Sequence, residues 1–461
     1  MNAIIVSTLL GVIMMFCSWG VKSQNAQKNI ALIGLLCLII ANLAQSNGWY
    51  EFNYDTKGML LFSHFGLYSN TLLFALTFIY VWINGEEISK LSNAAADFYS
   101  LIFFILCGVS VLTSFDNLLM LFIGIEILSI PLYILTGADK KSMISNEAAL
   151  KYFLMGSFST GILLLGITFI YGANGTFHMT STVIKLSTGI AHEQYLLSAG
   201  LILLFAAMNF KVSAAPFHFW TPDVYDGAPT VFTSFMATIA KAAGFLAFIN
   251  VFSTQYKSLT TSWTLLLTFV ILSTLLVGNI IAVFQRSVKR MLSYSSIAQA
   301  GFMLFALYGK SDIAIEGILI FAVVYSIATM GIFAVLVKMK ENSFEAFNGL
   351  AKTEPLLTFA TTVFLFSLAG IPLTGGFFAK YYMLAALLKA GAGLWLVIVA
   401  VVFAAISIYY YFKIIQAMYF TAGEPAIHLV SKNYQYQLLA LAILLLVLGI
   451  FPNLLLNYLY F

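Results

Sequence analysis

One glutamate and five lysines lie inside stretches of sequence that are otherwise long and apolar enough to cross a bilayer: Glu126, Lys151, Lys211, Lys241, Lys380 and Lys413. A charged side chain at the centre of a membrane helix costs about 2.5–3.5 kcal/mol on insertion scales. Such residues persist where they pair with one another, contact water or carry ions. The chemistry that these residue types offer is the binding and release of protons.

Glu126 is the one deeply placed acid, in the apolar segment "NLLMLFIGIEILSIPLYIL". It follows about nine residues of that segment, which places it near the middle of the bilayer at about 1.5 Å of rise per residue. We interpret it as a proton-accepting carboxylate whose charge is controlled by a lysine. The alternative is a static ion pair that locks two helices together.

Lys211 and Lys380 lie beside two interruptions of the apolar pattern, and Lys241 lies among small residues in "FTSFMATIAKAAGFLAF". Small side chains leave room for water or for close approach of helices. A lysine removed from water can exchange its proton near neutral pH, which arginine cannot do. We therefore expect these three lysines to carry protons. The alternative is snorkelling, in which the ammonium group reaches the membrane surface.

Lys151, Lys413 and His218 each have two interpretations. Lys151 follows Glu147 by four residues, so an ion pair along one helix face explains it equally well. Lys413, in "YYYFKIIQ", either pairs or snorkels. His218 lies at an interruption, where it either relays protons or caps freed backbone groups.

Six other polar residues have plainer interpretations. Asp223 and Asp226 follow the first interruption, where we expect solvated acids in a turn. The string "MLSYSSIAQAGFML" offers hydrogen bonds between helices from Ser293, Ser295, Ser296 and Gln299. The alternative for these four is bound water.

The composition sets the class of protein. The 461-residue chain is 61% hydrophobic and 9% charged, and a soluble protein with so few charges would expose too much apolar surface. The net charge of +4 gives no indication of nucleic-acid binding. The first apolar run has no basic residue before it and no convincing cleavage site, so we expect a retained transmembrane helix. The sequence therefore predicts an all-α polytopic membrane protein.

The apolar pattern predicts the spanning elements. A spanning helix needs about 20 apolar residues, and this length predicts about 14 segments. Their approximate ranges are 3–21, 30–45, 60–83, 97–114, 117–137, 147–171, 196–226, 229–253, 262–284, 291–308, 314–338, 355–389, 394–420 and 435–456.

Two of these segments are too long and are interrupted, the seventh around Ala215-Pro216 and the twelfth at "AGIPLTGGF", Ala369 to Phe377. Proline removes a backbone donor, and the freed carbonyls are tolerated only against protein or water. Broken helices at corresponding places point to inverted repeats around an ion path. We therefore predict two inverted five-helix repeats with broken helices seven and twelve. The implied divisions are 1–96 (helices 1–3), 97–253 (helices 4–8), 254–420 (helices 9–13) and 421–461 (helix 14).

Basic residues in the loops predict the orientation. With the N-terminus outside, the inner loops hold about 12 basic residues and the outer loops about 5, so both termini are predicted outside. The inner set is Lys22, Lys28, Lys90, Lys140, Lys141, Arg286, Lys289, Arg290, Lys338, Lys340, Lys352 and Lys432. The outer set is Lys57, Lys185, Lys257, Lys310 and Lys389.

Motifs for cofactor chemistry are absent from the sequence. It holds no GxGxxG after a strand, no Walker-type loop, no CxxC set and no haem-like pair of histidines. Cys17, Cys37 and Cys107 lie in apolar runs without metal-ligand spacing and are expected to be buried small hydrophobes. The sequence therefore predicts no catalytic redox residue, no metal site and no cofactor in this chain.

Several longer strings together resemble a known family. They are "FIGIEILSIPLYILTG", "AALKYFLMGSFSTGILLLGITFIYGANGT", "FKVSAAPFHFWTPDVYDGAPT", "ATIAKAAGF", "KRMLSYSSIAQAGFML" and "LAGIPLTGGFFAKYY". The chain resembles the antiporter-like membrane subunits of respiratory complex I, over about residues 97–420. The resemblance implies 14 helices with two inverted five-helix repeats.

The resemblance also implies site residues. The family's glutamate on helix five matches Glu126, with a partner lysine on helix six at Lys151. The lysines of helices seven, eight and twelve match Lys211, Lys241 and Lys380. One branch of the family has glutamate where this chain has Lys380, and another carries a long lateral helix after the last span. This chain departs from the first branch at Lys380 and from the second by ending at Phe461. Both departures favour the remaining, third branch of the family.

The function implied is proton translocation, driven by electron transfer from NADH to quinone elsewhere in the complex. NADH, FMN, iron–sulfur clusters and quinone are expected in other subunits, and the expected partners are antiporter-like subunit M, small subunits J and K and the lipid bilayer. The expected location is the bacterial inner membrane, with both termini periplasmic. A subunit of an Mrp-type antiporter, or a stand-alone cation/proton antiporter, is the alternative, and a membrane scaffold with static ion pairs is a third.

Overall fold

The computed structural model describes residues 1–461 except 53, 93, 180–190, 256–260, 309–310 and 458–461. Its regular elements are helices, and β pairing within the described ranges is limited to isolated bridges such as Leu60 with Phe115. The prediction of an all-α protein is therefore confirmed. Lys185, Lys257 and Lys310, which we counted in outer loops, lie outside the described residues.

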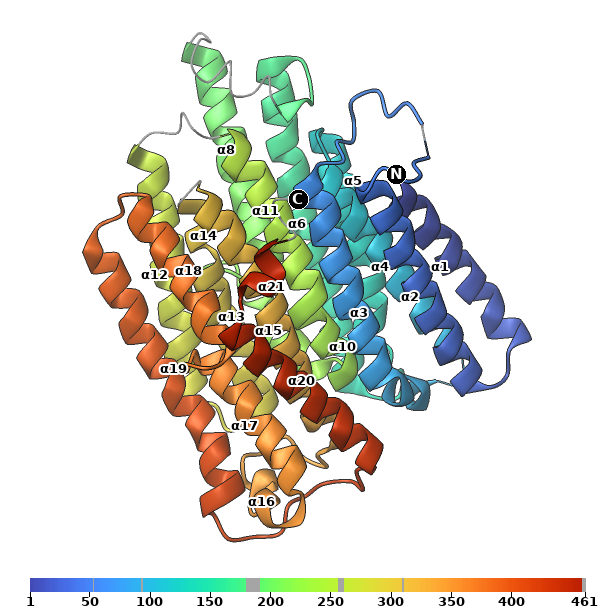
Figure 1. Ribbon diagram of the computed structural model, residues 1–461. Coiled ribbons are helices and arrows are strands. Elements are labelled where there is room, and N and C mark those ends of the chain that lie inside the picture. The colour runs from blue at the N-terminus through green and yellow to red at the C-terminus, as the bar shows by residue number, and fades with distance from the viewer. Residues whose placement is uncertain (53, 93, 180–190, 256–260, 309–310, 458–461) are drawn as a thin grey trace. The chain divides into compact units, whose positions relative to one another are not determined.

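The chain forms two compact units, each of which is described by itself (Figure 1). Unit 1 comprises residues 1–212 and 239–263, and unit 2 comprises residues 213–238 and 264–461. The two inverted repeats, and the divisions of the chain drawn from them, stay predictions.

Unit 1 is a bundle of long helices around α4. In this bundle α4 packs against α1, α2, α3 and α5, and α6 packs against α5 and α8. In the apolar stretch of α4, 83% of residues are buried, against 22% in α1, so α4 is central and α1 is peripheral. The helices are α1 (Asn2–Gly20), α2 (Gln24–Ser46), α3 (His64–Leu91), α4 (Ala95–Ser114), α5 (Leu118–Thr136), α6 (Met143–Asn174), α8 (Ala191–Lys211) and α11 (Lys241–Gln255).

Unit 2 is built around α15, whose apolar stretch is fully buried. Helices α10, α17, α18 and α20 pack on α15, and α9 packs on α13. The helices are α9 (Trp220–Gly227), α10 (Thr230–Phe235), α12 (Thr261–Val283, whose first three residues fall in unit 1), α13 (Val288–Met303), α14 (Phe305–Tyr308), α15 (Asp312–Lys338), α16 (Leu350–Thr353), α17 (Pro355–Ala369), α18 (Gly375–Lys389), α19 (Leu394–Phe420), α20 (Lys432–Ile450) and α21 (Asn453–Leu456).

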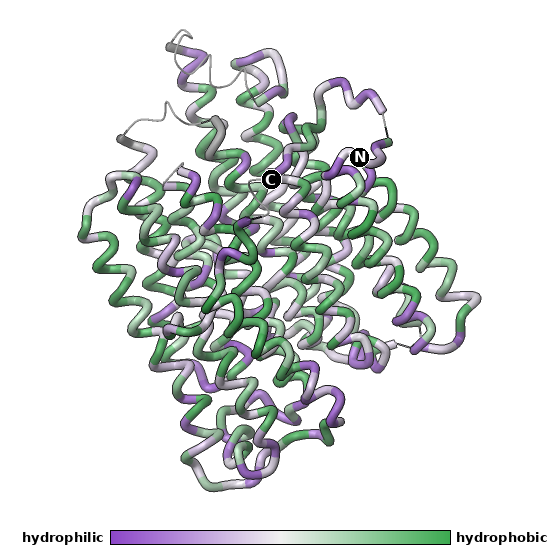
Figure 2. Tube along the Cα trace, in the orientation of Figure 1, coloured by the Kyte–Doolittle hydropathy of each residue, from purple (hydrophilic) through white to green (hydrophobic). Residues whose placement is uncertain are grey.

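Thirteen of the described helical stretches are long and apolar enough to cross a membrane. The predicted twelfth segment forms α17 and α18, of 15 residues each. Figure 2 shows apolar residues along the helices and hydrophilic residues gathered toward many helix ends and loops, as a bilayer requires. The chain is therefore a multi-pass membrane protein, and the total of 14 helices stays a prediction.

Both helix interruptions occur where the sequence predicted them. Helix α8 ends at Lys211 and α9 begins at Trp220, so the stretch around Pro216 is not helical. Helix α17 ends at Ala369, where Gly370 adopts a left-handed conformation (φ 82°) and its N–H bonds the carbonyls of Phe366 and Ser367. Glycine adopts this conformation without strain, which explains its position at the end of the helix.

Three features of the helices differ from the sequence-based expectations. A single π-helical turn, Met236–Ala240, lies directly before Lys241. Lys289 and Lys338, which we had placed in inner loops, lie inside α13 and α15 and are 4% and 8% exposed. The predicted segment 291–308 begins after Lys289 because polar residues near a helix end shorten the apolar run that a hydropathy pattern detects. Lys338 is the last residue both of the predicted segment 314–338 and of α15.

Candidate proton-conducting site

In unit 1 the Glu126 carboxylate lies on α5 and accepts a hydrogen bond from a threonine on α6. The Thr160 hydroxyl oxygen is 2.8 Å from Glu126 Oε1 and 3.0 Å from the carbonyl oxygen of Gly156. Thr160 itself is buried at 8% exposure. The acid thus has a neutral partner that satisfies one of its oxygens.

Lys211 is the last residue of α8, and its ammonium group donates to the hydroxyl of Ser129, 3.1 Å away on α5. Ser129 lies three residues after Glu126, so the two share one face of the helix. The described contacts of Lys211 and Glu126 include no direct ion pair between them. Two hydroxyl groups therefore lie beside these two charges.

Lys241 is the first residue of α11, directly after the π turn, and is 2% exposed. A π turn inserts a residue into the helix and shifts the direction of the side chains beside it, and such turns are frequent at functional sites. Neighbouring Gly244 leaves space, because a Cβ there would meet only Val212 at 3.5 Å. The Lys241 side chain is therefore enclosed by protein and does not face the bilayer.

Lys151 lies on α6 and forms an ion pair with Glu147, at 2.7 Å between Nζ and Oε1. The two side chains are 44% and 62% exposed in this chain. Lys151 is nine residues before Thr160, which is about 14 Å along a helix. In this structure Glu126 therefore bonds Thr160, while Lys151 pairs along its own helix.

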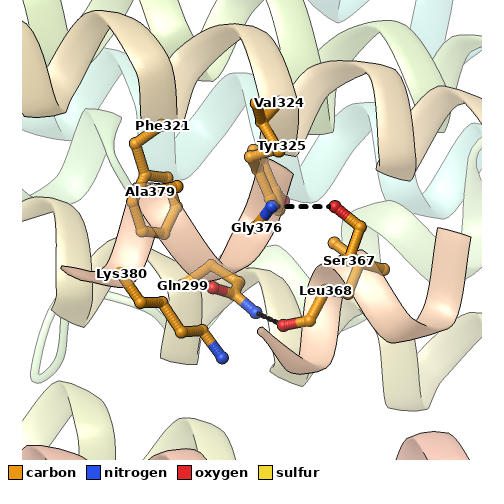
Figure 3. A pocket seen from close by; sticks show the side chains of 9 residues that line it. All are labelled: Gln299, Phe321, Val324, Tyr325, Ser367, Leu368, Gly376, Ala379 and Lys380. Carbon is orange, nitrogen blue, oxygen red and sulfur yellow. Dashed lines mark hydrogen bonds between the residues drawn. The ribbon is translucent and has the colours of Figure 1, made fainter. Parts of the chain in front are cut away.

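Unit 2 holds Lys380 at the second interruption (Figure 3). Its ammonium group donates to the carbonyl oxygen of Ala369, the last residue of α17, at 2.8 Å. It also lies 5.0 Å from the centre of the Phe302 ring. The end of a helix carries unpaired carbonyls and a partial negative charge, so this position suits a cation that has no acidic partner.

A small cavity adjoins Lys380 and is lined by Gln299, Tyr325, Ser367 and Gly376 among others (Figure 3). Its volume of about 10 Å³ is close to the least that accepts one water molecule. The Gln299 amide donates to the carbonyl of Leu368 at 2.9 Å and to the hydroxyl of Tyr411 at 3.2 Å.

These contacts extend the polar region around Lys380 toward α19. The Tyr411 hydroxyl shares a short hydrogen bond with Ser295, and neighbouring Tyr410 donates to Asn279 at 3.1 Å. Ser295 and Gln299 thus make the bonds between helices that the sequence predicted.

His218 and Lys413, the two candidate relay residues, lie in unit 2. His218 is 6% exposed, and its Nδ1 is buried without a hydrogen-bond partner in the described part of the chain. The Lys413 ammonium lies 4.6 Å from the centre of the Phe344 ring and is partly exposed, as a snorkelling lysine would be.

Asp223 and Asp226, expected as solvated acids, form part of an ionic cluster on α9. Arg290 binds Asp223 at 2.9 Å and approaches Asp226 at 3.7 Å. Lys289 donates to the carbonyls of Asp226 and Ala228 at 2.8 and 2.6 Å. The first turn of α13 thus anchors the end of the proline-rich stretch.

Sequence reasoning missed Thr160, Ser129 and Tyr411, because serine, threonine and tyrosine are frequent in apolar helices without special function. A spacing rule finds one of them, since Ser129 follows Glu126 by three residues. Among the described residues, no three His, Cys, Asp or Glu side chains gather so that they could hold a metal ion.

The sequence and the fold are similar to those of known proteins. Residues 116–407 match the family model described as "NADH:quinone oxidoreductase/Mrp antiporter, TM". NADH-quinone oxidoreductase subunit N of Cytophaga hutchinsonii is 39% identical over 464 aligned positions, covering 99% of each chain. The chain belongs to the NADH-quinone oxidoreductase subunit N family. This confirms the resemblance to antiporter-like complex I subunits and identifies the expected third branch as subunit N.

Solved structures agree with this family. The chain is similar to one in "Respiratory complex I from Thermus thermophilus with bound Aureothin", with a TM-score of 0.84, 30% identity and coverage of 99% and 98% of the two chains. It is also similar to a chain of the Mrp complex from Dietzia, with a TM-score of 0.82 but 19% identity, covering 100% and 96%. The second similarity shows a shared fold alone.

Proposed function

We propose that this chain is a proton-translocating membrane subunit of NADH-quinone oxidoreductase, respiratory complex I. Full-length similarity to subunit N of Cytophaga hutchinsonii supports the complex. The observation that carries the translocation is the burial of Lys241 and Lys380, which are 2% and 7% exposed inside apolar helices. Lysines at such positions are costly and rare, and they commonly mark the paths of protons or ions.

In this proposal, Glu126, Lys151, Lys211, Lys241 and Lys380 carry the protons, and His218 and Lys413 are candidate relays. Protons enter from the inner side, load a central lysine and leave outward. At about 8 Å and an effective dielectric of about 20, two unit charges interact by about 2 kcal/mol. Moving Glu126 and a lysine apart until this interaction is lost therefore changes the pH at which either group binds a proton by about 1.5 pH units.

The energy comes from electron transfer from NADH to quinone in other subunits, which hold NADH, FMN, iron–sulfur clusters and quinone. This chain contributes no redox centre and acts as a translocase subunit. Its neighbours are membrane subunits M, J and K, and its location is the bacterial inner membrane with both termini periplasmic. Support comes from the name and the full-length match of its relatives.

Lys241→Ala tests the proposal in the assembled complex. We expect NADH-driven proton uptake into inverted membrane vesicles to fall by about 10²-fold or more, the usual effect of losing a proton-transfer group. Lys141→Ala, at an exposed lysine between α5 and α6, is the matched control and should pump normally. Normal stoichiometry in Lys241→Ala would remove Lys241 from the path.

An Mrp-type or stand-alone antiporter subunit is the second candidate, because the family model also covers Mrp antiporters. Purification in mild detergent separates the two functions. Co-isolation with flavin and iron–sulfur subunits supports the respiratory complex, whereas isolation with other antiporter subunits, or alone, supports the second candidate. Unchanged pumping after substitution of Glu126, Lys211, Lys241 and Lys380 together would favour a static scaffold instead.

A further inference from the structure

We propose that the hydroxyl groups of Ser129 and Thr160 are positioning groups for proton exchange at Lys211 and Glu126. They keep the ammonium and the carboxylate from forming a direct ion pair. They also provide hydrogen bonds to both charge states of each ion. This inference rests on the proposed function, because it assigns new residues to the same path.

The first step of the argument is the geometry of Thr160. Its single hydroxyl proton has two acceptors within reach, Glu126 Oε1 at 2.8 Å and the Gly156 carbonyl at 3.0 Å. When Glu126 is ionised, Thr160 donates to it. When Glu126 is protonated, Thr160 can donate to Gly156 instead, and its oxygen then accepts the new O–H of the acid.

Ser129 offers the same choice to Lys211. Its hydroxyl donates to the carbonyl of Ile125 at 2.6 Å and accepts from Lys211 Nζ at 3.1 Å. After the ammonium has lost a proton, the amine carries a lone pair. Rotation of the Ser129 hydroxyl from Ile125 toward Nζ satisfies that lone pair.

The proton balance needs no further reactant. One N–H bond of the Lys211 ammonium breaks and one O–H bond forms on Glu126, so that two separately held ions become two neutral groups. The Gly156 carbonyl then receives the Thr160 hydroxyl, and the Ile125 carbonyl gives up the Ser129 hydroxyl. A direct, desolvated ion pair would instead hold both groups in the charged state.

Hydroxyl bonds to the carbonyl four residues earlier are common in membrane helices and do not by themselves indicate function. Thr168 on α6 and Ser110 on α4 make such bonds, to Leu164 at 2.8 Å and to Leu106 at 2.9 Å. Ser129 and Thr160 differ because each also bonds an ionisable side chain. Thr168 and Ser110 are therefore matched controls.

The test compares Ser129→Ala and Thr160→Val with Ser110→Ala and Thr168→Val in the assembled complex. The amount of complex, NADH oxidation and proton uptake are measured in inverted vesicles across the neutral pH range. We expect both test variants to assemble, to pump about tenfold more slowly and to shift the pH profile of pumping by about one unit. The controls should keep the wild-type rate and profile, and Thr160→Ser should restore both.

Two outcomes would overturn the inference. The first is a wild-type rate and pH profile in Ser129→Ala and Thr160→Val while Lys211→Ala fails to pump, and this leaves the proposed function standing. The second is an equal loss in the control variants, because the effect would then belong to any hydroxyl that bonds its own helix. Normal pumping in Lys211→Ala as well would overturn the proposed function itself.

Discussion

Three lysines of this chain, of which Lys289 and Lys380 are buried, direct their ammonium groups to neutral acceptors. Lys211 donates to the Ser129 hydroxyl, Lys380 to the Ala369 carbonyl and Lys289 to two carbonyls at the end of α9. Neutral acceptors stabilise an ammonium group less than a carboxylate does. The charged form is therefore easier to lose, which suits Lys211 and Lys380 to repeated proton exchange.

Lys380→Arg tests whether the helix-end position needs a charge or an exchangeable proton. Arginine keeps the positive charge but does not release its proton in the accessible pH range. We expect the variant to assemble and proton uptake to fall by about 10²-fold. Lys389→Arg, at the exposed end of the same helix, should match the wild type. Full pumping by Lys380→Arg would mean that a fixed charge is sufficient.

Asp116, in the loop between α4 and α5, provides a test of pH dependence outside the membrane spans. Burial raises the pKa of its carboxyl group, and His178 acts in the opposite direction. A carboxyl whose folded pKa is raised contributes most to stability below its unfolded value of about 3.9, and that contribution is lost as pH rises through the folded pKa.

Asp116→Asn removes this loss, so the variant should unfold at a higher temperature than the wild type at neutral pH. The difference should shrink as pH is lowered, because the wild-type acid then becomes neutral as well. Thermal unfolding of the detergent-purified complex at several pH values measures it, with Asp55→Asn at an exposed carboxylate as the control. A difference independent of pH would point to lost contacts instead.

At the scale of elements, the sequence predicts helix ends that follow from proline and glycine, and it misses local changes of helix geometry that follow from packing. Both interruptions are predictable because Pro216 and Pro372 each remove a backbone donor and Gly370 favours the end of a helix. The bounds of α19 coincide with the predicted 394–420. No residue type in the sequence marks the π turn at Met236–Ala240. A π turn adds one residue to a helix, and the packing of neighbouring side chains determines where this occurs.

Gly376 at the start of α18 is where the interruption is most tightly packed. A Cβ there would lie 1.7 Å from the carbonyl oxygen of Ser367, so Gly376→Ala must move α18, which carries Lys380, relative to α17. We expect a loss of about 1–3 kcal/mol in the free energy of unfolding. The loss of stability would be measured as a smaller amount of assembled complex and a lower unfolding temperature.

The matched control is Gly161→Ala on α6, because no atom lies within 4 Å of a Cβ added there. Alanine favours helix over glycine by about 1 kcal/mol, so this variant should be neutral or slightly stabilised. Equal stability of the two alanine variants would contradict the close contact between Gly376 and Ser367.

At the scale of the whole molecule, composition and the length of the apolar segments are sufficient to predict an all-α membrane protein, because the bilayer allows few folds. They are insufficient to predict all the residues of the candidate site. The segment scan finds Glu126 and the buried lysines because charge is rare in apolar runs. It cannot find Thr160 or Ser129, whose function depends on which helix faces which, and it placed Lys289 in a loop. Packing between helices that are distant in sequence therefore determines the residues of the site that the sequence pattern does not predict.

The orientation of the chain is the remaining whole-molecule prediction. An excess of lysine and arginine marks the inner loops, so both termini should lie outside. In a background in which Cys17, Cys37 and Cys107 are replaced, a cysteine at Tyr54 should react with a membrane-impermeant maleimide in intact cells. A cysteine at Lys141 should react only after the membrane is opened.

The same measurement tests whether α17 and α18 together cross the membrane once. Each has 15 residues, which at about 1.5 Å per residue is too short for a bilayer core of about 30 Å. A single crossing places Lys389 outside and both Lys352 and Glu424 inside. Labelling of Lys389→Cys in intact cells, with Lys352→Cys and Glu424→Cys protected, is the expected pattern. If Lys352→Cys and Lys389→Cys reacted from the same side, the pair would be re-entrant, and the Lys380 ammonium would face one aqueous side instead of exchanging protons between the two.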